Sequence, residues 1–124
     1  WVDNGPGWCA VLLRSAAEVL AVKPDWAALG SLKLGLVAPQ PLGADTQFEV
    51  RAFVPALGVP EDPVTGTAHV QLVPFWAARL GRNSLICRQA SARGGTLWCE
   101  WRGDRVRMAG DAVLYAKGEI HLPP

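Results

Sequence analysis

The sequence has few of the cysteine and histidine residues that stabilise small folds through disulfides or bound metal ions. It holds three cysteines, Cys9, Cys87 and Cys99, and no Cys-x-x-Cys spacing. This odd number predicts neither a disulfide framework nor a zinc site, so we expect core thiols in a reducing compartment. The two histidines, His69 and His121, have no partner at metal-ligand or triad spacing. No metal site is therefore predicted.

Long apolar runs and clusters of one charge are also missing. No stretch reaches the ~20 apolar residues that span a bilayer, and the first residues lack the basic and apolar regions of a signal peptide. The 12 Lys and Arg residues balance 11 Asp and Glu residues, which leaves a net charge of +1. Without a run of like charges, nucleic acid is a poor partner. We expect a cytoplasmic protein with neither a membrane nor a nucleic-acid partner.

The composition predicts one compact domain. The chain has 124 residues, of which 50% are hydrophobic and 19% are charged, so it can bury a core unaided. No linker or internal repeat divides it, and residues 1–124 are expected to form a single domain. The chain opens with Trp1 in place of Met and runs directly into an expected strand. This suggests that other residues once preceded it.

Apolar patterning predicts short strands around one long helix. Short helical segments should follow Ser15 and Asp25, which are common helix caps. Residues 65–80 are apolar all round the helix axis, as in a buried helix that Pro74 should bend. The predicted fold is α+β, with a curled antiparallel or mixed sheet, a half-barrel, around this central helix. Its strands are expected at 8–14, 32–37, 48–54, 84–90, 96–101, 105–109 and 112–116.

Polar groups concentrate where a loop leads into the long helix. Residues 61–69 (EDPVTGTAH) join carboxylates, two hydroxyls and a glycine at the helix start. The first helical N–H groups are unpaired and the dipole is positive there, so a substrate carboxylate fits, and Gly66 would let it approach the backbone. Thr65 and Thr67 could donate or accept hydrogen bonds, and Asp62 could orient an amine or hydroxyl of the ligand.

A purely structural interpretation competes with this one. Asp and Thr are common N-caps and glycine is common before helices, so the same residues also suit a simple helix start. His69 on an apolar helix is more typical of a core residue than of a catalyst. Three tryptophans either fill the core or cover surface that another lobe or subunit hides: Trp1, Trp8 and Trp26.

Three motifs stand in order along the chain: residues 61–69, then 70–81 (VQLVPFWAARLG), then 88–95 (RQASARGG). Together they resemble the phenazine-biosynthesis PhzF-like isomerase family. The resemblance extends from the DNGP opening at 3–6 to the GEI close at 118–120. It implies one lobe of a diaminopimelate epimerase-like fold, in which two similar lobes, each a curled sheet around a central helix, flank the active site.

The resemblance implies a cofactor-independent isomerase or epimerase that moves a proton on a small carboxylated substrate. It identifies this chain with the C-terminal lobe. It puts Asp62 and Thr67, the latter usually serine in the family, at positions that help to hold substrate. The glutamate that acts as base and acid belongs to the N-terminal lobe, so no catalytic residue is assigned here beyond auxiliary roles for these two. The predicted substrate-binding residues are Asp62, Thr65, Gly66 and Thr67.

Two functions stay open from the sequence alone. The chain is either the C-terminal lobe of such an isomerase, completed by a second lobe, or a non-enzymatic small-acid binding or interaction module that dimerises. The expected partners are a small carboxylated molecule and either a second lobe or a homodimer partner.

Overall fold

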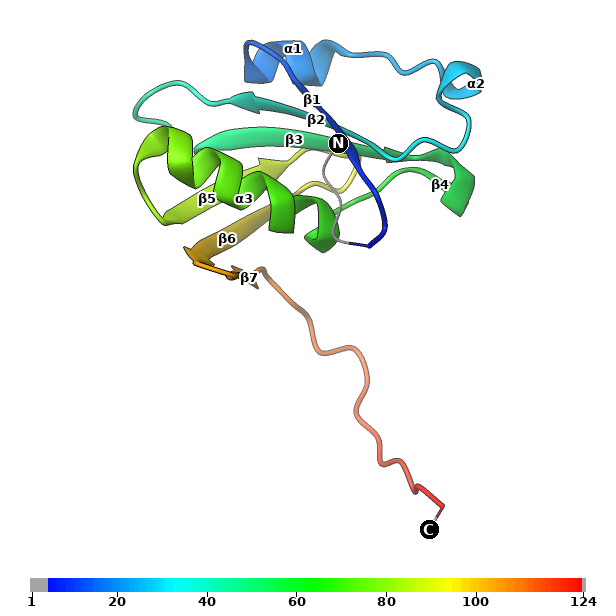
Figure 1. Ribbon diagram of the computed structural model, residues 1–124. Coiled ribbons are helices and arrows are strands. Elements are labelled where there is room, and N and C mark those ends of the chain that lie inside the picture. The colour runs from blue at the N-terminus through cyan, green and yellow to red at the C-terminus, as the bar shows by residue number, and fades with distance from the viewer. Residues whose placement is uncertain (1–4, 124) are drawn as a thin grey trace.

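The computed structural model describes residues 5–123 and shows one mixed sheet with helices on both faces (Figure 1). Its strand order is β1 (Cys9–Leu12), β2 (Leu34–Pro39), β3 (Phe48–Val54), β5 (Ser84–Gln89), β6 (Gly95–Arg102) and β7 (Arg105–Ala109), and β4 (Val59–Glu61) pairs with β3. The β1–β2 and β3–β5 pairs are parallel, and the others are antiparallel. The predicted α+β fold with a mixed, unclosed sheet is confirmed.

Local signals place the helices as the sequence predicts. The Ser15 hydroxyl accepts a hydrogen bond from the Glu18 amide at 3.2 Å and starts α1 (Ala16–Ala21). The Asp25 carboxylate accepts from the Ala28 amide at 3.0 Å and starts α2 (Trp26–Leu29). The long helix α3 (Gly66–Leu80) ends at Gly81, whose φ of 63° favours glycine. A short 3-10 helix, η1 (Pro55–Leu57), lies in the segment before α3.

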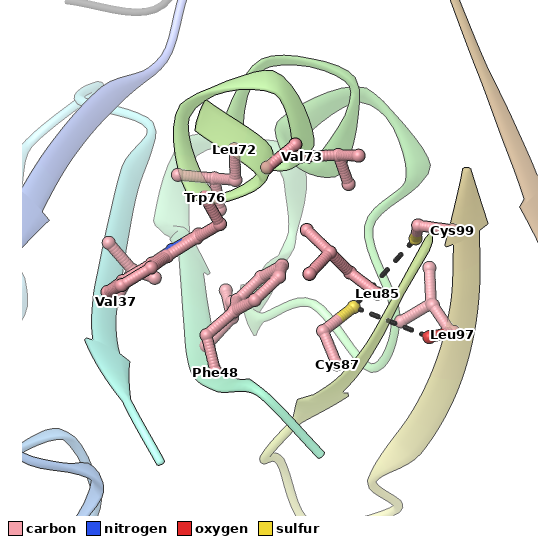
Figure 2. Close-up of a cluster of buried hydrophobic side chains, with 11 residues drawn as sticks. Val37, Phe48, Leu72, Val73, Trp76, Leu85, Cys87, Leu97 and Cys99 are labelled. Carbon is pink, nitrogen blue, oxygen red and sulfur yellow. Dashed lines mark hydrogen bonds between the residues drawn. The ribbon is translucent and has the colours of Figure 1, made fainter. Parts of the chain in front are cut away.

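The main core lies between α3 and the sheet (Figure 2). The Trp76 ring of α3 stacks on Phe48 of β3, with centroids 5.6 Å apart and planes 13° apart. The helix continues through Pro74 to its end. The buried residues around this pair are Val37, Val50, Leu72, Val73, Ala77, Leu85, Cys87, Leu97 and Cys99. The prediction of a central buried helix is thus confirmed.

The opposite face of the sheet carries α1 and α2. Side chains alternate along a strand, so Phe48 and Val50 of β3 face α3 while Phe53 faces the shorter helices. Val19 of α1 is fully buried in a cluster with Leu36, Ala38 and Phe53. Both faces of β3 are therefore covered, which explains its imperfect alternation of apolar and polar residues. None of the helices among residues 5–123 has the length and apolarity of a membrane span.

The structure corrects the last predicted strand. Residues 112–116 form no strand, and the chain after β7 runs away from the sheet (Figure 1). Five large apolar side chains there are 81–100% exposed: Val113, Leu114, Tyr115, Ile120 and Leu122. A strand needs a neighbour for its backbone groups, and the chain does not turn back at Gly110 to reach the open edge of β7.

The cysteines are free thiols, as the sequence predicts. Cys87 and Cys99 are buried in the main core with sulfur atoms 4.0 Å apart. The hydrogen bond between them, together with burial, raises the pKa of Cys87 above its ordinary value, which disfavours the reactive thiolate. Cys9 is only half-buried, because β1 lies at the edge of the sheet.

One carboxylate is fully buried on the face that carries α1. Glu49 accepts a hydrogen bond from Gln40 Nε2 through Oε2 at 2.5 Å. Its other oxygen, Oε1, lies 3.6 Å from Arg88 Nε and has no hydrogen-bond partner among the described residues. Desolvation raises the pKa of Glu49, while Arg88 and Gln40 act in the opposite direction. Folding therefore favours the protonated form of Glu49 over its ionised form.

Replacing Glu49 with Gln should stabilise the protein at neutral pH. Because the folded-state pKa is raised, the favourable contribution of Glu49 is present below the unfolded-state pKa and is lost as pH rises through the folded-state pKa. We expect Glu49→Gln to gain about 1 kcal/mol at neutral pH and nothing at about pH 4. Thermal unfolding across this range measures the difference, with Glu119→Gln in the exposed tail as control. A gain that is independent of pH would contradict this account.

Candidate functional site

The predicted polar residues meet at the N-terminal end of α3. A pocket of about 270 Å³ opens there, and it contains Asp62, Thr65 and Thr67. The remaining lining residues are Pro6, Trp8, Lys33, Val54, Leu57 and Val59. Gly66 is the first residue of α3, and a Cβ there would meet only Met108 Cε at 3.7 Å. Since this is an ordinary contact, packing within the chain does not require glycine at that position.

Thr65 precedes α3 but its side chain does not cap the helix. The hydroxyl Oγ1 donates to Asp62 Oδ2 at 2.6 Å, and no side-chain hydrogen bond from Thr65 reaches the helix. The Asp62 carboxylate likewise bonds no helical amide within residues 5–123. The interpretation of these two side chains as simple N-caps is therefore wrong. Neither side chain caps the first turn of α3.

A buried side chain from β5 holds the turn between Asp62 and Thr65. Gln89 is fully buried, and its Oε1 accepts from the Thr65 amide at 2.8 Å. Its Nε2 donates to the Asp62 carbonyl at 2.8 Å and to Thr65 Oγ1 at 3.0 Å. This role of Gln89 was not predicted from the sequence, although the residue lies inside the RQASARGG motif. That motif was the one available signal, because the contact joins residues 24 apart.

Trp8 reaches the site from the segment before β1. Its side chain is 3% exposed and packs with Ala52, Val54 and Ala68. The indole Nε1 donates to Thr67 Oγ1 at 3.1 Å. Of the two interpretations offered for Trp8, core filling is correct, with an unpredicted contact to the site. Trp26 is partly exposed and packs edge-to-face on Phe53, whereas Trp1 and the first half of the DNGP opening lie outside the described residues.

His69 is a buried core residue, as the sequence favours. Its Nδ1 lies 2.6 Å from the Thr65 carbonyl, which only accepts, so Nδ1 carries the proton. Burial lowers the pKa of His69, and the bond to Thr65 partly opposes this effect. The imidazole is therefore neutral near neutral pH, and its buried Nε2 has no hydrogen-bond partner among the described residues. His69 supports the backbone of Thr65 from inside the core.

The pocket carries charges of both signs beside an apolar wall. Lys33 donates to the Pro6 carbonyl at 2.7 Å and keeps two further N–H donors. Asp62 is the only carboxylate among the described lining residues. The nearby Glu61 pairs with Arg51 through two contacts of 2.6 and 3.0 Å, so it is already engaged. Within residues 5–123 no cluster of three or more His, Cys, Asp or Glu residues could hold a metal ion.

Gly95 keeps the turn of the site in place from the start of β6. A Cβ on Gly95 would overlap Val64 Cγ2, next to Thr65. Gly95→Ala should therefore displace the turn and lose about 1–3 kcal/mol of stability. Adding Val64→Ala removes the clashing methyl groups and should recover most of this loss. Denaturant unfolding measures both effects, and strictly additive losses in the double variant would contradict the packing argument.

The chain is similar to known proteins of one family. Residues 1–118 match the family described as phenazine biosynthesis-like protein. An uncharacterized isomerase of Pseudomonas aeruginosa is 52% identical over 112 residues, which are 90% of this chain and 43% of that protein. Another isomerase of the same organism is 43% identical over 112 residues. The chain thus spans less than half the length of these relatives.

Solved structures agree with the sequence relatives. A PhzC/PhzF protein from Clostridium difficile matches with a TM-score of 0.76 and 37% identity. A PhzF-family protein from Enterococcus faecalis matches with a TM-score of 0.77 and 38% identity. Each match covers 91% of this chain and 44% of the other. The chain therefore belongs to the PhzF-like isomerase family and shares its diaminopimelate epimerase-like fold.

Proposed function

We propose that the chain is the C-terminal lobe of a PhzF-like, cofactor-independent isomerase or epimerase that moves a proton on a small carboxylated substrate. The observation that carries this proposal is the pocket where Asp62, Thr65 and Thr67 meet at the start of α3. The substrate carboxylate would face the first amides of α3, which Gly66 leaves open to close approach. An amine or hydroxyl of the substrate would face Asp62.

The catalytic base of the proposed reaction comes from a second lobe. A base must lie within hydrogen-bond reach of the proton that it removes. Asp62 already accepts a hydrogen bond from Thr65, and Glu61 is paired with Arg51. Because the chain covers 43% of its Pseudomonas relative, the relative has ample length for a lobe that carries a glutamate. The substrate class, cofactor independence and a cytoplasmic location stay predictions.

Two exposed apolar features support a second lobe as the partner. One is a pocket of about 280 Å³ between β1 and α3, lined by Ala10, Leu12, Val37, Gln71, Leu72, Phe75 and Arg79. The other is the segment after β7 with its exposed Val113, Leu114 and Tyr115. Apolar surfaces of this kind mark protein interfaces, and the open edge of β1 can accept an added strand. A second copy of the chain is the competing partner and would favour the dimeric binding module.

Reconstitution tests the proposed reaction. We expect the chain mixed with the N-terminal lobe of the Pseudomonas relative to exchange substrate protons with solvent deuterium on small amino or hydroxy acids, as followed by proton NMR. The chain alone should not. Asp62→Asn and Thr67→Val should slow exchange by about 10²-fold, whereas Thr67→Ser keeps the hydroxyl and should stay active. Exchange that persists in Asp62→Asn, or that the isolated chain performs, would contradict the proposal.

Truncation tests the proposed partner surface. Removing residues 112–124 should leave the melting temperature of the lobe unchanged, because residues 112–123 form no strand with it. The same truncation should weaken association with the second lobe at least about tenfold, since five exposed apolar side chains are lost. Calorimetry measures the melting temperature and the affinity for the second lobe, and light scattering measures the mass of the assembly. A stable homodimer of the intact chain would instead favour the binding-module alternative.

A further inference from the structure

We propose that Gln89 is the positioning residue of this pocket. Through Thr65 it fixes Asp62 Oδ2 as a hydrogen-bond acceptor, and it thereby leaves Asp62 Oδ1 to recognise an ammonium or hydroxyl group of the ligand. The inference rests on the proposed function, because it concerns the same pocket. It adds a residue outside the loop-to-helix segment and assigns a direction to each hydrogen bond of the turn. Gln89 lies at the end of β5 and is fully buried.

Two contacts determine which way the Gln89 amide points. The Thr65 backbone N–H can only donate, so the Gln89 atom 2.8 Å from it is the oxygen, Oε1. The Asp62 backbone carbonyl can only accept, so the Gln89 atom 2.8 Å from it is the nitrogen, Nε2. Both contacts require the same orientation, and the reversed amide would lose both hydrogen bonds. The direction of the remaining hydrogen bonds follows from this one.

The Thr65 hydroxyl takes its direction from Gln89. Nε2 donates to Thr65 Oγ1 at 3.0 Å, so the hydroxyl oxygen accepts on that side. Its own proton then goes to Asp62 Oδ2 at 2.6 Å. Thr65 is 5% exposed, so a proton directed elsewhere would be left without an acceptor. Asp62 Oδ2 therefore accepts this hydrogen bond.

The other oxygen of Asp62 is left for a ligand. Asp62 lines the pocket, and its Oδ1 makes no hydrogen bond with residues 5–123. A carboxylate oxygen offers lone pairs, so the matching ligand group is a donor such as an ammonium or a hydroxyl. A ligand carboxylate is repelled there and goes to the side of Lys33 and the first turn of α3. Gln89, which does not line the pocket, thus determines which side of the pocket accepts a hydrogen bond from the ligand.

Gln89→Glu is the diagnostic substitution because it keeps the shape and removes both donors. The carboxylate of residue 89 would then accept from Thr65 Oγ1, and the hydroxyl would turn away from Asp62. Gln89→Met removes the same hydrogen bonds and introduces no charge. It replaces Gln89→Glu in the experiment if that variant does not fold. Ser91→Ala is the matched control, because Ser91 Oγ donates to the Pro63 carbonyl of the same turn at 3.2 Å. It loosens the turn without reversing any bond at Asp62.

The test is NMR titration of the 124-residue chain with acetate, glycine and glycolate, which share a carboxylate and differ in the donor group. We expect the parent and Ser91→Ala to bind glycine and glycolate about tenfold more tightly than acetate, the factor expected for one hydrogen bond to a charged group. Gln89→Glu and Gln89→Met should lose this preference and keep their affinity for acetate. Equal binding of the three probes by the parent, or loss of preference in Ser91→Ala, would overturn the inference.

A second readout separates this inference from the proposed function. The Thr65 hydroxyl proton should exchange slowly with water in the parent and in Ser91→Ala, and quickly in both Gln89 variants. If none of the probes shifts the pocket amides but this pattern holds, the binding function fails and the hydrogen-bond directions stand. If the hydroxyl proton exchanges as fast in the parent as in the variants, the directions are wrong whatever the probes do.

Discussion

The burial of α3 is the constraint on which the rest of this structure depends. Each large side chain that α3 buries contributes about 1.5–3 kcal/mol, and its buried face carries Leu72, Val73 and Trp76. The sheet covers this face of α3, and Trp76 stacks on Phe48 within the contact. The same packing sets where α3 begins, because its first turn lies against Gln89 at the end of β5.

The site takes its rigidity from this core. The turn from Asp62 to Thr65 is exposed to the pocket on one side and bonded to fully buried side chains on the other. Gln89 uses both donors and its acceptor, and His69 donates to the Thr65 carbonyl. A buried polar group that lacks a partner costs about 1–3 kcal/mol, so alternative arrangements of this turn are disfavoured. The polar side chains at the pocket are thus positioned by two side chains, Gln89 and His69, that do not line it.

Apolar side chains remain exposed after β7 and between β1 and α3. Val113 to Tyr115 have the composition of a strand but lie exposed, and the pocket between β1 and α3 is apolar and open. The chain covers 43–44% of the relatives that share its fold. An exposed segment, an open sheet edge and a site with one carboxylate all agree with the proposal that a second lobe completes both the core and the active site.

The sequence by itself determined what depends on neighbours along the chain. Apolar periodicity and the caps Ser15, Asp25 and Gly81 located the helices, and apolar runs located most of the strands. The short spacing within residues 61–69 brought Asp62 near Thr67. Only the tertiary structure decided which distant side chains complete the site, namely Trp8, Lys33 and Gln89, and that Thr65 bonds Asp62 in place of capping α3. It also decided that residues 112–116 form no strand. Local preferences act over a few residues, whereas hydrogen bonds across the core depend on the path of the whole chain.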